Sequence, residues 1–314
     1  MAVQEFSLLT SDVNISTSDV DINIKMEKIL IIGAGEIGKA LGRILKQKNS
    51  VEFWDKDKTK IPHFKNLDEL VLWTDIIFLC VPAFSLNTVL KNISLNLKNK
   101  VLICLSKGVD PKTKELPNEI LEKYTLNYGL LYGPMIAEEL NKNLGGFAIL
   151  AAKKENVFNL AKKIFSKTQI KIQKSNDVCS VGFCGVLKNI YALGLGIVEA
   201  QKLGLNLKGK YVVEAIKEMK EITNKFCGEN NLVFEACGLG DLIATGFSPD
   251  SANYALGEKL AKKQKIIKKS EGIIALPIIF QKIKSQKIKA PLLENIYKIV
   301  FKNLKPSKIL ENID

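Results

Sequence analysis

The stretch IIGAGEIG, residues 31–38, decides the fold expected of this chain. It follows the apolar run KILII and opens a segment whose apolar residues recur at helical spacing. Between a strand and a helix, Gly33, Gly35 and Gly38 permit a tight turn and a close backbone approach, and the helix N-terminus offers free N–H groups to a pyrophosphate. This order predicts a dinucleotide-binding site rather than a purely structural glycine turn. Two further residues of the turn are expected to contact the cofactor through their backbone: Glu36 and Ile37.

The residue that ends the next apolar run, VEFW, bears on which dinucleotide is bound. Asp55 lies about 20 residues after Gly35, where a carboxylate bonds the hydroxyls of the adenine ribose. A carboxylate repels a 2′-phosphate, and the neighbouring Lys56 and Lys58 partly offset that repulsion. The sequence therefore favours NAD as the cofactor, with NADP as the alternative.

Residues 26–175 alternate between strand-like runs and helical patterns. The strand-like runs are KILII, VEFW, DIIFLCV, VLICLS, YGLLY, GGFAILAA and QIKIQ. Apolar runs without strict alternation are typical of strands covered on both faces. We therefore predict an α/β fold, with a Rossmann-type, doubly wound parallel sheet as the dinucleotide-binding domain. Residues 1–25 are polar and lack a period, which predicts a disordered N-terminal extension.

The pattern changes after Asp177 to long helical segments without comparable strand runs. Residues 176–314 are therefore expected to form an all-helical C-terminal domain that carries the substrate and catalytic residues, with Asp177 as the N-cap of its first helix. Parallel sheets of this class bind ligands at the carboxyl ends of their strands. We accordingly expect the active site in the cleft between the two domains.

Composition excludes several classes of partner. The chain has 314 residues and a net charge of +13, but its lysines are dispersed and Arg43 is the only arginine, so no nucleic-acid site is predicted. The apolar runs fall short of the roughly 20 residues that cross a bilayer, and no leader pattern follows Met1, so we expect a cytoplasmic protein without a membrane partner. The general positive field favours an anionic small-molecule substrate.

The cysteines are expected to act as small buried hydrophobic residues. None has the CxxC spacing of a metal or redox site, and two lie in apolar runs that resemble buried strands. Neither bridges nor a metal site are therefore predicted. The six are Cys80, Cys104, Cys179, Cys184, Cys227 and Cys237.

Lys188 is the candidate for acid/base chemistry. The single histidine, His63, lies in a loop-like segment and is interpreted as a surface residue, which argues against an imidazole acid. Lys188 lies within VCSVGFCGVLKNIYALGLGI, an apolar helical segment punctuated by glycines. Such surroundings desolvate an ammonium and lower its pKa, as a lysine acid/base requires. The interior glycines cost helix stability and indicate that something approaches closely.

Over Lys28 to about Pro291 the chain resembles the NAD(P)-dependent glycerol-3-phosphate dehydrogenases. The resemblance is carried in order by GAGEIG, the VP of FLCVP, SKG at 106–108, GPMIAEE at 133–139, GVLKN, GLGDL, SAN at 251–253 and SEG at 270–272. It implies reduction of dihydroxyacetone phosphate to glycerol 3-phosphate by a hydride from NAD(P)H, a step that feeds glycerophospholipid synthesis. Because dimers are common in the family, it also implies a homodimer.

The resemblance assigns roles to individual residues. Lys188 protonates the developing alkoxide, and Asp241 orients it. The expected substrate-binding residues are Lys107, Gly133, Asn189, Thr245, Ser251 and Asn253. Residues that border the cofactor, besides the glycine turn and Asp55, are expected to be Lys107, Ala137 and Glu271.

The chain departs from the family at the substrate phosphate. Ala252 stands in place of the arginine of the SRN motif, Tyr254 and Ala255 replace the arginines that usually follow, and Met135 replaces the serine of GPS. Charge-assisted hydrogen bonds are therefore missing from this part of the site.

These departures leave alternatives open. One is that the phosphate is held less rigidly by Ser251, Asn253, Lys107 and a displaced lysine such as Lys259. Another is a related dehydrogenase that acts on a different small hydroxy or keto compound. A third is a non-catalytic NAD-binding regulator, against which the retention of both Lys188 and Asp241 argues.

Overall fold

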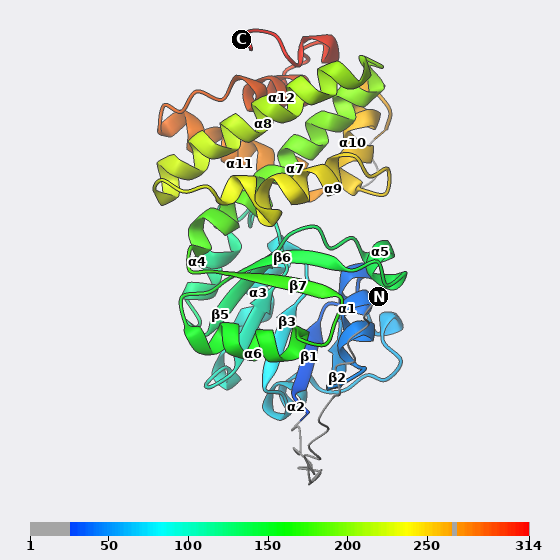
Figure 1. The fold of residues 1–314 in the computed structure, drawn as a ribbon, viewed down its shortest axis with the longest axis vertical. Coiled ribbons are helices and arrows are strands. Elements are labelled where there is room, and N and C mark those ends of the chain that lie inside the picture. Colours follow the sequence, from blue (N-terminus) through cyan, green and yellow to red (C-terminus); the bar gives the residue numbers. More distant parts are fainter. Residues whose placement is uncertain (1–25, 266–268, 314) are drawn as a thin grey trace, which may run out of the picture.

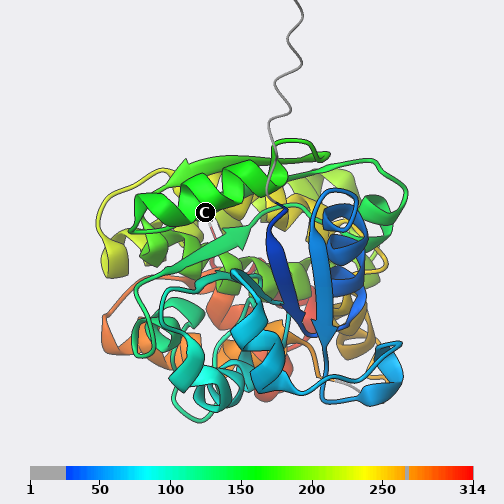
Figure 2. The ribbon, with the colours of Figure 1, turned by 90° about the horizontal axis from the view of Figure 1, so that it is seen from below.

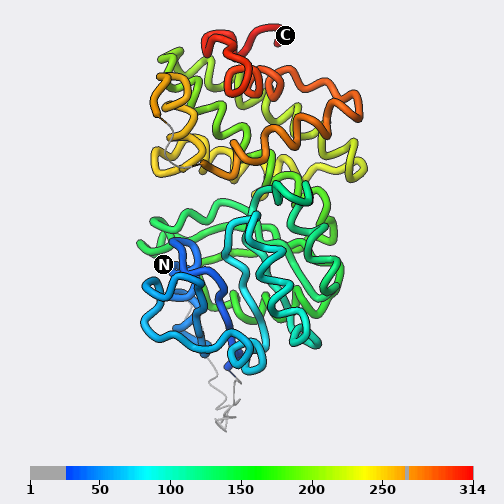
Figure 3. Tube along the Cα trace, turned by 180° about the vertical axis from the view of Figure 1, so that it is seen from behind, coloured from blue at the N-terminus to red at the C-terminus, as the bar shows by residue number. Residues whose placement is uncertain are grey.

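The structure is a computed structural model that describes residues 26–265 and 269–313. The extension predicted for residues 1–25 lies outside the described residues, and so does Asp314. The chain forms two lobes, an α/β lobe that holds the sheet and a lobe built of helices alone (Figure 1). Figure 3 shows the same division from behind, with the C-terminal end of the chain at the far side of the helical lobe.

The sheet has seven strands in the order β2-β1-β3-β4-β5-β6-β7. All neighbouring strands are parallel except the β5 and β6 pair. The segment between these two holds only the short helix α5 (Ala137–Asn141), which does not cross the sheet, so the chain returns antiparallel. The strands are β1 (Lys28–Ile32), β2 (Ser50–Trp54), β3 (Ile76–Leu79), β4 (Val101–Cys104), β5 (Tyr128–Tyr132), β6 (Gly146–Ala151) and β7 (Ile170–Ser175).

Helices cover both faces of the sheet, which confirms the predicted doubly wound α/β fold. Along β1, Leu30 and Ile32 pack on the side of α2, α3 and α4, whereas Ile29 and Ile31 pack on the side of α1 and α6. Figure 2, viewed from below, shows these two layers with the strands between them. The helices of this lobe are α1 (Glu36–Leu45), α2 (Leu67–Trp73), α3 (Ala83–Ile93), α4 (Pro117–Glu122) and α6 (Glu155–Phe165), with short turns at η1 (Lys58–Lys60) and η2 (Ser94–Asn96).

The change from sheet to helices falls between Ser175, which ends β7, and Val178, which begins α7. Asp177 is the N-cap of α7, because its carboxylate accepts from the Ser180 backbone N–H at 2.9 Å. The helical lobe consists of α7 (Val178–Ala200), α8 (Gly204–Cys227), the turn η3 (Leu232–Phe234), the π-helical turn η4 (Ala236–Gly240), α9 (Asp241–Gly246), α10 (Ala252–Ala261), α11 (Glu271–Ser285), α12 (Pro291–Phe301) and η5 (Pro306–Lys308).

Helix α7 is the central element of the helical lobe and packs against α8, α9, α10 and α11. It is long and apolar enough to cross a membrane, but its most apolar window is 100% buried inside the structure, as in the core helix of a soluble protein. The glycines of α7 permit close packing: a Cβ on Gly185 would lie 2.6 Å from the Tyr132 ring, and one on Gly196 would overlap the Tyr254 carbonyl. The close approach predicted at these glycines is therefore made by the protein itself.

The prediction that no cysteine forms a bridge is wrong for one pair. Cys179, in the first turn of α7, is disulfide-bonded to Cys227, the last residue of α8, across a separation of 48 residues. Two long helices that pack against each other bring these ends together, which sequence spacing does not reveal. The other four cysteines are free, and three of them are buried as predicted: Cys104, Cys184 and Cys237.

Candidate active site

The glycine turn between β1 and α1 has the geometry that a bound dinucleotide requires. Gly33 has φ +105°, and a Cβ there would lie 2.6 Å from the Cys80 carbonyl oxygen, so only glycine fits. A Cβ on Gly38 would overlap the carbonyl oxygen of Gly33. In contrast, a Cβ on Gly35 would meet no atom within 4 Å. Two of the glycines therefore close the turn, whereas Gly35 leaves open space above it.

Asp55 is tied to the glycine turn by hydrogen bonds. Its two carboxylate oxygens accept from the backbone N–H groups of Ala34, at 2.8 Å, and Asp57, at 2.9 Å. Gly35 caps α1 without a side-chain bond, so the first N–H groups of that helix point into the open space. Because each carboxylate oxygen keeps a second lone pair, Asp55 can still accept from ribose hydroxyls. The residues present therefore fit a pyrophosphate and the ribose beside it.

A cleft of about 730 Å³ extends from the glycine turn to the helical lobe. Six of the expected cofactor residues line it: Gly33, Gly35, Ile37, Asp55, Lys107 and Glu271. Three others do not line it within the described part of the chain. Glu36 is exposed at the start of α1, Gly38 is buried beneath the turn, and Ala137 is buried in the core with Leu140.

Lys56 and Lys58, the two lysines that follow Asp55, differ in their position relative to the cleft. The Lys58 Nζ lies 4.2 Å from the centre of the Phe64 ring, whereas Lys56 and Lys60 line the cleft. Lys58 and Lys60 both belong to the η1 turn, which Asp57 caps, and their side chains leave that turn in different directions. The second cation at this end of the cleft is therefore Lys60, which a reading of local sequence does not distinguish from its neighbours.

Glu271, the first residue of α11, is an incompletely bonded carboxyl group in the cleft wall. One oxygen accepts from the Ala83 backbone N–H at 3.2 Å, and the other, Oε2, is buried and lacks a partner among the described residues. Burial raises the pKa of Glu271 to about 7, although the Ala83 bond opposes this. A Cβ on Gly108 would overlap Oε2. Glu271 thus places a carboxyl group in the cleft wall, with one oxygen buried against Gly108.

Four side chains from both lobes meet near the inner end of the cleft. Lys188, on α7, lies 3.2 Å from Asp241 Oδ1 and donates to Thr245 Oγ1 at 2.8 Å. Thr245 in turn donates to Asp241 Oδ1 at 3.1 Å. Lys107, which follows β4, bonds the other Asp241 oxygen at 2.5 Å and the Gly133 carbonyl at 3.3 Å. We call Lys107, Lys188, Asp241 and Thr245 the lysine–aspartate cluster.

The cluster holds one carboxylate between two ammonium groups in a buried setting. Burial lowers the pKa of Lys188 to about 8, against the opposing effect of the Asp241 charge and with a contribution from Lys107. For Asp241, burial alone would raise the pKa, but the two lysines outweigh it and the pKa is lowered. Lys188 can therefore donate a proton and take one back near neutral pH, beside a carboxylate that stays ionised.

Two asparagines connect the helices around the cluster. Asn253, on α10, donates to Asn189 on α7 at 2.9 Å and accepts from the Gly272 backbone N–H at 2.9 Å. Both asparagines line the cleft. Ser251 caps α10, since its hydroxyl accepts from the Tyr254 N–H at 3.3 Å. The expected substrate residues thus converge, but several of their polar atoms already hold the helices together.

Comparisons with known proteins bear on the whole chain. The sequence family described as NAD-dependent glycerol-3-phosphate dehydrogenase C-terminus matches residues 177–311, and the corresponding N-terminus family matches residues 58–158. The chain belongs to the NAD-dependent glycerol-3-phosphate dehydrogenase family. A glycerol-3-phosphate dehydrogenase [NAD(P)+] of Acinetobacter baumannii is 28% identical over 90% of this chain and 88% of its own length. The glycerol-3-phosphate dehydrogenase [NAD(P)+] of Psychrobacter cryohalolentis is 26% identical over 95% of this chain and 76% of its own length.

Solved structures agree in fold. A glycerol-3-phosphate dehydrogenase from Coxiella burnetii superposes with a TM-score of 0.82 at 23% identity, over 92% of this chain and 98% of that one. The glycerol-3-phosphate dehydrogenase from Plasmodium falciparum superposes with a TM-score of 0.80 at 21% identity, over 92% of this chain and 95% of that one. At these identities the likeness establishes the fold, which places the family's Rossmann and helical domains on the two lobes described above.

The two positions that the resemblance assigns to the substrate phosphate carry no charge here. Ala252 is exposed at the start of α10, and Met135 packs against the core of the sheet. Lys259, the displaced lysine that the sequence suggested, is exposed on α10 and does not line the cleft. Among the described residues that line the cleft, Lys107 is a cation that bonds the Gly133 carbonyl, two residues before Met135.

Hydrogen bonds that were not expected from sequence hold the loop that carries Lys107. Tyr132 donates to the Ser106 carbonyl, and the Ser106 hydroxyl donates to the Val81 carbonyl at 2.5 Å, which fixes the loop that carries Lys107. The only indication of these contacts in the sequence is that the VP and SKG motifs both follow strand ends, which meet at one edge of a parallel sheet. His63 is exposed, as predicted for a surface loop residue.

Proposed function

We propose that this chain reduces dihydroxyacetone phosphate to glycerol 3-phosphate with NAD(P)H, and catalyses the reverse oxidation. The observation that carries the proposal is the lysine–aspartate cluster beside a cleft built for a dinucleotide. Membership of the family supports the same reaction. A non-catalytic regulator would need neither a buried lysine of lowered pKa nor its carboxylate partner.

The nicotinamide, when bound, supplies the hydride that reduces the carbonyl carbon. Lys188 Nζ then donates a proton to the oxygen on which negative charge develops, so that one hydride and one proton together give the alcohol. Asp241 holds the ammonium in place and stabilises its charge, and Thr245 orients both groups. In the oxidation direction, neutral Lys188 accepts the hydroxyl proton.

The substrate oxygens are proposed to bond to groups around the cluster. Asn189 and Thr245 face the reacting end, and Lys107, held by the Gly133 carbonyl, adds positive charge. Ser251 and Asn253 are proposed to contact the phosphate. Since both already bond within the protein, they would share or exchange those bonds when substrate binds.

The cofactor is proposed to lie along the cleft from the glycine turn to Glu271. The backbone of Glu36 and Ile37 contacts the pyrophosphate, with Gly38 closing the turn beneath it. Asp55 accepts from the adenine ribose, which favours NAD. Glu271 and Ala137 are proposed at the nicotinamide end, and the position of Glu271 in the lining of the cleft supports its ligand contact better than the buried position of Ala137 does.

The phosphate half of the substrate decides between the family reaction and a related one. With Ala252 in the arginine position, Lys107 and the positive field of the chain carry the recognition of the anion. NADH oxidation should be measured with dihydroxyacetone phosphate and with dihydroxyacetone, and then repeated with NADPH. A higher kcat/KM for the phosphorylated substrate is expected. Equal kcat/KM values would assign a different hydroxy or keto substrate, and no oxidation by folded protein would contradict dehydrogenase activity.

The wider setting is also proposed. Glycerol 3-phosphate is the backbone of glycerophospholipids, so the product would feed their synthesis in the cytoplasm. A homodimer of two-domain subunits, divided near residues 175 and 176, is expected from the family. Light scattering of the purified chain tests the dimer, for which a monomer mass is the contrary result.

A further inference from the structure

Tyr132, the last residue of β5, is fully buried and contacts both lobes. Its ring packs against Gly185 of α7, where an added Cβ would lie 2.6 Å from two of the ring carbons. Any side chain at position 185 would therefore collide with the ring. Gly185 comes one helical turn before Lys188, so the two residues are neighbours on the surface of α7. Tyr132 thus connects a strand end of the sheet with the helix that carries Lys188.

The same ring contacts Lys107, in the loop that follows β4. The Lys107 ammonium lies 5.4 Å from the centre of the Tyr132 ring, which is within the range of a cation–π contact. Such a contact is stronger where water is excluded, and here only 17% of the Lys107 side chain is exposed. The stem of Lys107 is also close to α7, because a Cβ on Gly185 would lie 3.4 Å from its Cγ. The ring therefore restrains the ammonium between the loop and the helix.

The Tyr132 hydroxyl restrains the backbone of the same loop. It donates to the carbonyl oxygen of Ser106, the residue before Lys107. Burial raises the pKa of Tyr132 well above its usual value, so the hydroxyl keeps its proton and remains a donor. One side chain thus holds Lys107 at two places, at the ammonium by its ring and at the preceding carbonyl by its hydroxyl.

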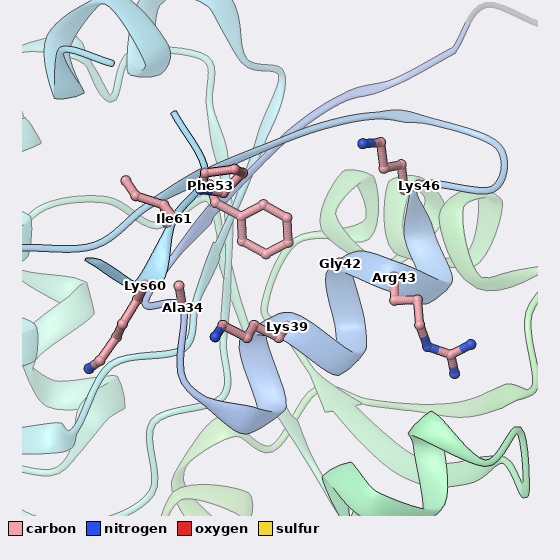
Figure 4. A pocket seen from close by; sticks show the side chains of 9 residues that line it. Ala34, Lys39, Gly42, Arg43, Lys46, Phe53, Lys60 and Ile61 are labelled. Atoms are coloured by element: carbon pink, nitrogen blue, oxygen red, sulfur yellow. The ribbon is translucent and has the colours of Figure 1, made fainter. Parts of the chain in front are cut away.

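Lysines on the surface of the α/β lobe lack this kind of support. Lys39 and Lys46, at the rim of a small pocket of about 290 Å³ beside α1, are exposed and project from different places along the helix (Figure 4). A lysine stem is flexible, so the place of its charge depends on what packs around it. The Tyr132 ring supplies that packing for Lys107, in addition to its ion pair with Asp241 at 2.5 Å.

The place of the Lys107 charge bears on the proposed proton donor. Burial lowers the pKa of Lys188 to about 8, the charge of Asp241 opposes this, and the charge of Lys107 adds to the lowering. If Lys107 moved away from Asp241, its contribution would be lost and the carboxylate would pair with Lys188 alone. Both changes would raise the pKa of Lys188.

We propose that Tyr132 is a positioning residue for the reaction, whose ring and hydroxyl hold the Lys107 ammonium beside Asp241 and whose contact with Gly185 sets its distance from Lys188. This inference rests on the proposed dehydrogenase function. Tyr132 acts through Lys107, and the ring and the glycine form a matched pair across the two lobes.

Kinetics of dihydroxyacetone phosphate reduction over a range of pH test the proposal. Tyr132→Met removes the ring and the hydroxyl but leaves a flexible apolar side chain that can fill much of the space. Misplacement of Lys107 should lower kcat by roughly tenfold to a hundredfold. The break near pH 8 should move to higher pH by about half a unit or more, because the pKa of Lys188 rises. Tyr132→Phe keeps the ring and should leave the break within about 0.2 units of wild type.

Tyr128→Met is the matched control. Tyr128 belongs to the same strand and is equally buried, but its hydroxyl donates to Glu122 of α4 at 2.9 Å rather than to the loop that carries Lys107. This variant also loses a buried ring and one hydrogen bond, so denaturant unfolding should show a loss of stability like that of Tyr132→Met. Its kcat and its pH break should remain those of wild type.

A double-mutant cycle gives a second test that does not depend on the stability of Tyr132→Met. Tyr132→Phe removes only the hydroxyl and should lower kcat by about threefold to tenfold, because the loop before Lys107 loses one hydrogen bond. In the Lys107→Met background the same substitution should change kcat by less than about twofold, since the residue through which it acts is gone.

Three results would overturn the inference. In the first, Tyr132→Met and Tyr128→Met lower kcat equally and leave the pH break in place, which makes Tyr132 a core residue only. In the second, Tyr132→Phe lowers kcat as much in the Lys107→Met background as in wild type. Both of these leave the proposed function standing. In the third, folded wild-type protein shows no reduction of dihydroxyacetone phosphate, which overturns the proposed function together with the role of Tyr132.

Discussion

The two ends of the cleft handle charge in opposite ways. At the inner end, the lysine–aspartate cluster is buried and its members bond to one another. At the adenosine end, Lys39, Lys56 and Lys60 are exposed around a single buried carboxylate, Asp55. Burial shifts a pKa and so prepares a group for proton transfer, whereas exposed charge recognises an anion without changing its own protonation. We propose that the chain separates proton transfer from anion recognition along one cleft.

Removal of the Lys188 ammonium at the inner end of the cleft should have the largest effect on activity. Lys188→Ala should lower kcat for dihydroxyacetone phosphate reduction by roughly 10²- to 10⁴-fold, because it removes the proposed proton donor and the other ammonium, Lys107, is held by the second Asp241 oxygen and the Gly133 carbonyl. The Kd of NADH, measured by fluorescence quenching, should change little. Lys225→Ala, which removes an exposed lysine from α8, is the control. A Lys188→Ala enzyme with near-native kcat, or with an equal loss of NADH affinity, would break the comparison.

The carboxylate partner should affect both stability and pKa. Asp241→Asn leaves two lysines beside an uncharged amide in a buried setting, where loss of one partner of a buried pair costs about 3 to 5 kcal/mol. Since the Asp241 charge raises the pKa of Lys188, its removal should also move the break in the pH–rate profile to lower pH. Denaturant unfolding and the pH–rate profile measure the two effects, and an unmoved break would contradict the proposed pairing.

The disulfide tests how far the inner end depends on its helical support. Reduction of Cys179–Cys227 releases the ends of α7 and α8, and bridges of this kind typically contribute about 2 to 4 kcal/mol. C179S/C227S should therefore unfold at lower denaturant than oxidised wild type, and at the same concentration as reduced wild type. NADH affinity should be retained. Identical unfolding of the oxidised and reduced wild type would show that the bridge contributes nothing.

The smallest expected effects come from two alanine substitutions in the glycine turn, at Gly38 and at Gly35, which should affect stability and NADH binding differently. Gly38→Ala places a Cβ on the Gly33 carbonyl, and such overpacking costs about 1 to 3 kcal/mol. Gly35→Ala meets no protein atom within 4 Å and should leave stability unchanged while it weakens NADH binding, because its Cβ enters the proposed pyrophosphate space. Thermal unfolding and NADH titration distinguish them. Equal stability losses in both variants would contradict the open geometry at Gly35.

Local motifs predicted the fold and brought out the main candidates of the site. The strand, glycine turn and helix order is contained in a few consecutive residues, and Lys188 and Asp241 each lie in a short recognisable segment. The family resemblance then indicated that these two segments meet, and the structure places the side chains 3.2 Å apart.

The features that sequence did not predict all depend on which elements meet in space. The Cys179–Cys227 bridge requires α7 and α8 to lie side by side, and the antiparallel β6 depends on a connection that fails to cross the sheet. Lys58 and Lys60 are alike in sequence, but one lies over Phe64 and the other lines the cleft. Local periodicity carries no information on such placements.

The pH dependence of the two reaction directions tests the central claim most directly. The pKa of Lys188 is lowered to about 8, and reduction uses its protonated form whereas oxidation uses its neutral form. The kcat/KM for dihydroxyacetone phosphate should therefore fall as the pH rises through about 8, and the kcat/KM for glycerol 3-phosphate should rise through the same region. Profiles that run in the same direction, or that show no break near pH 8, would contradict a proton-donating Lys188.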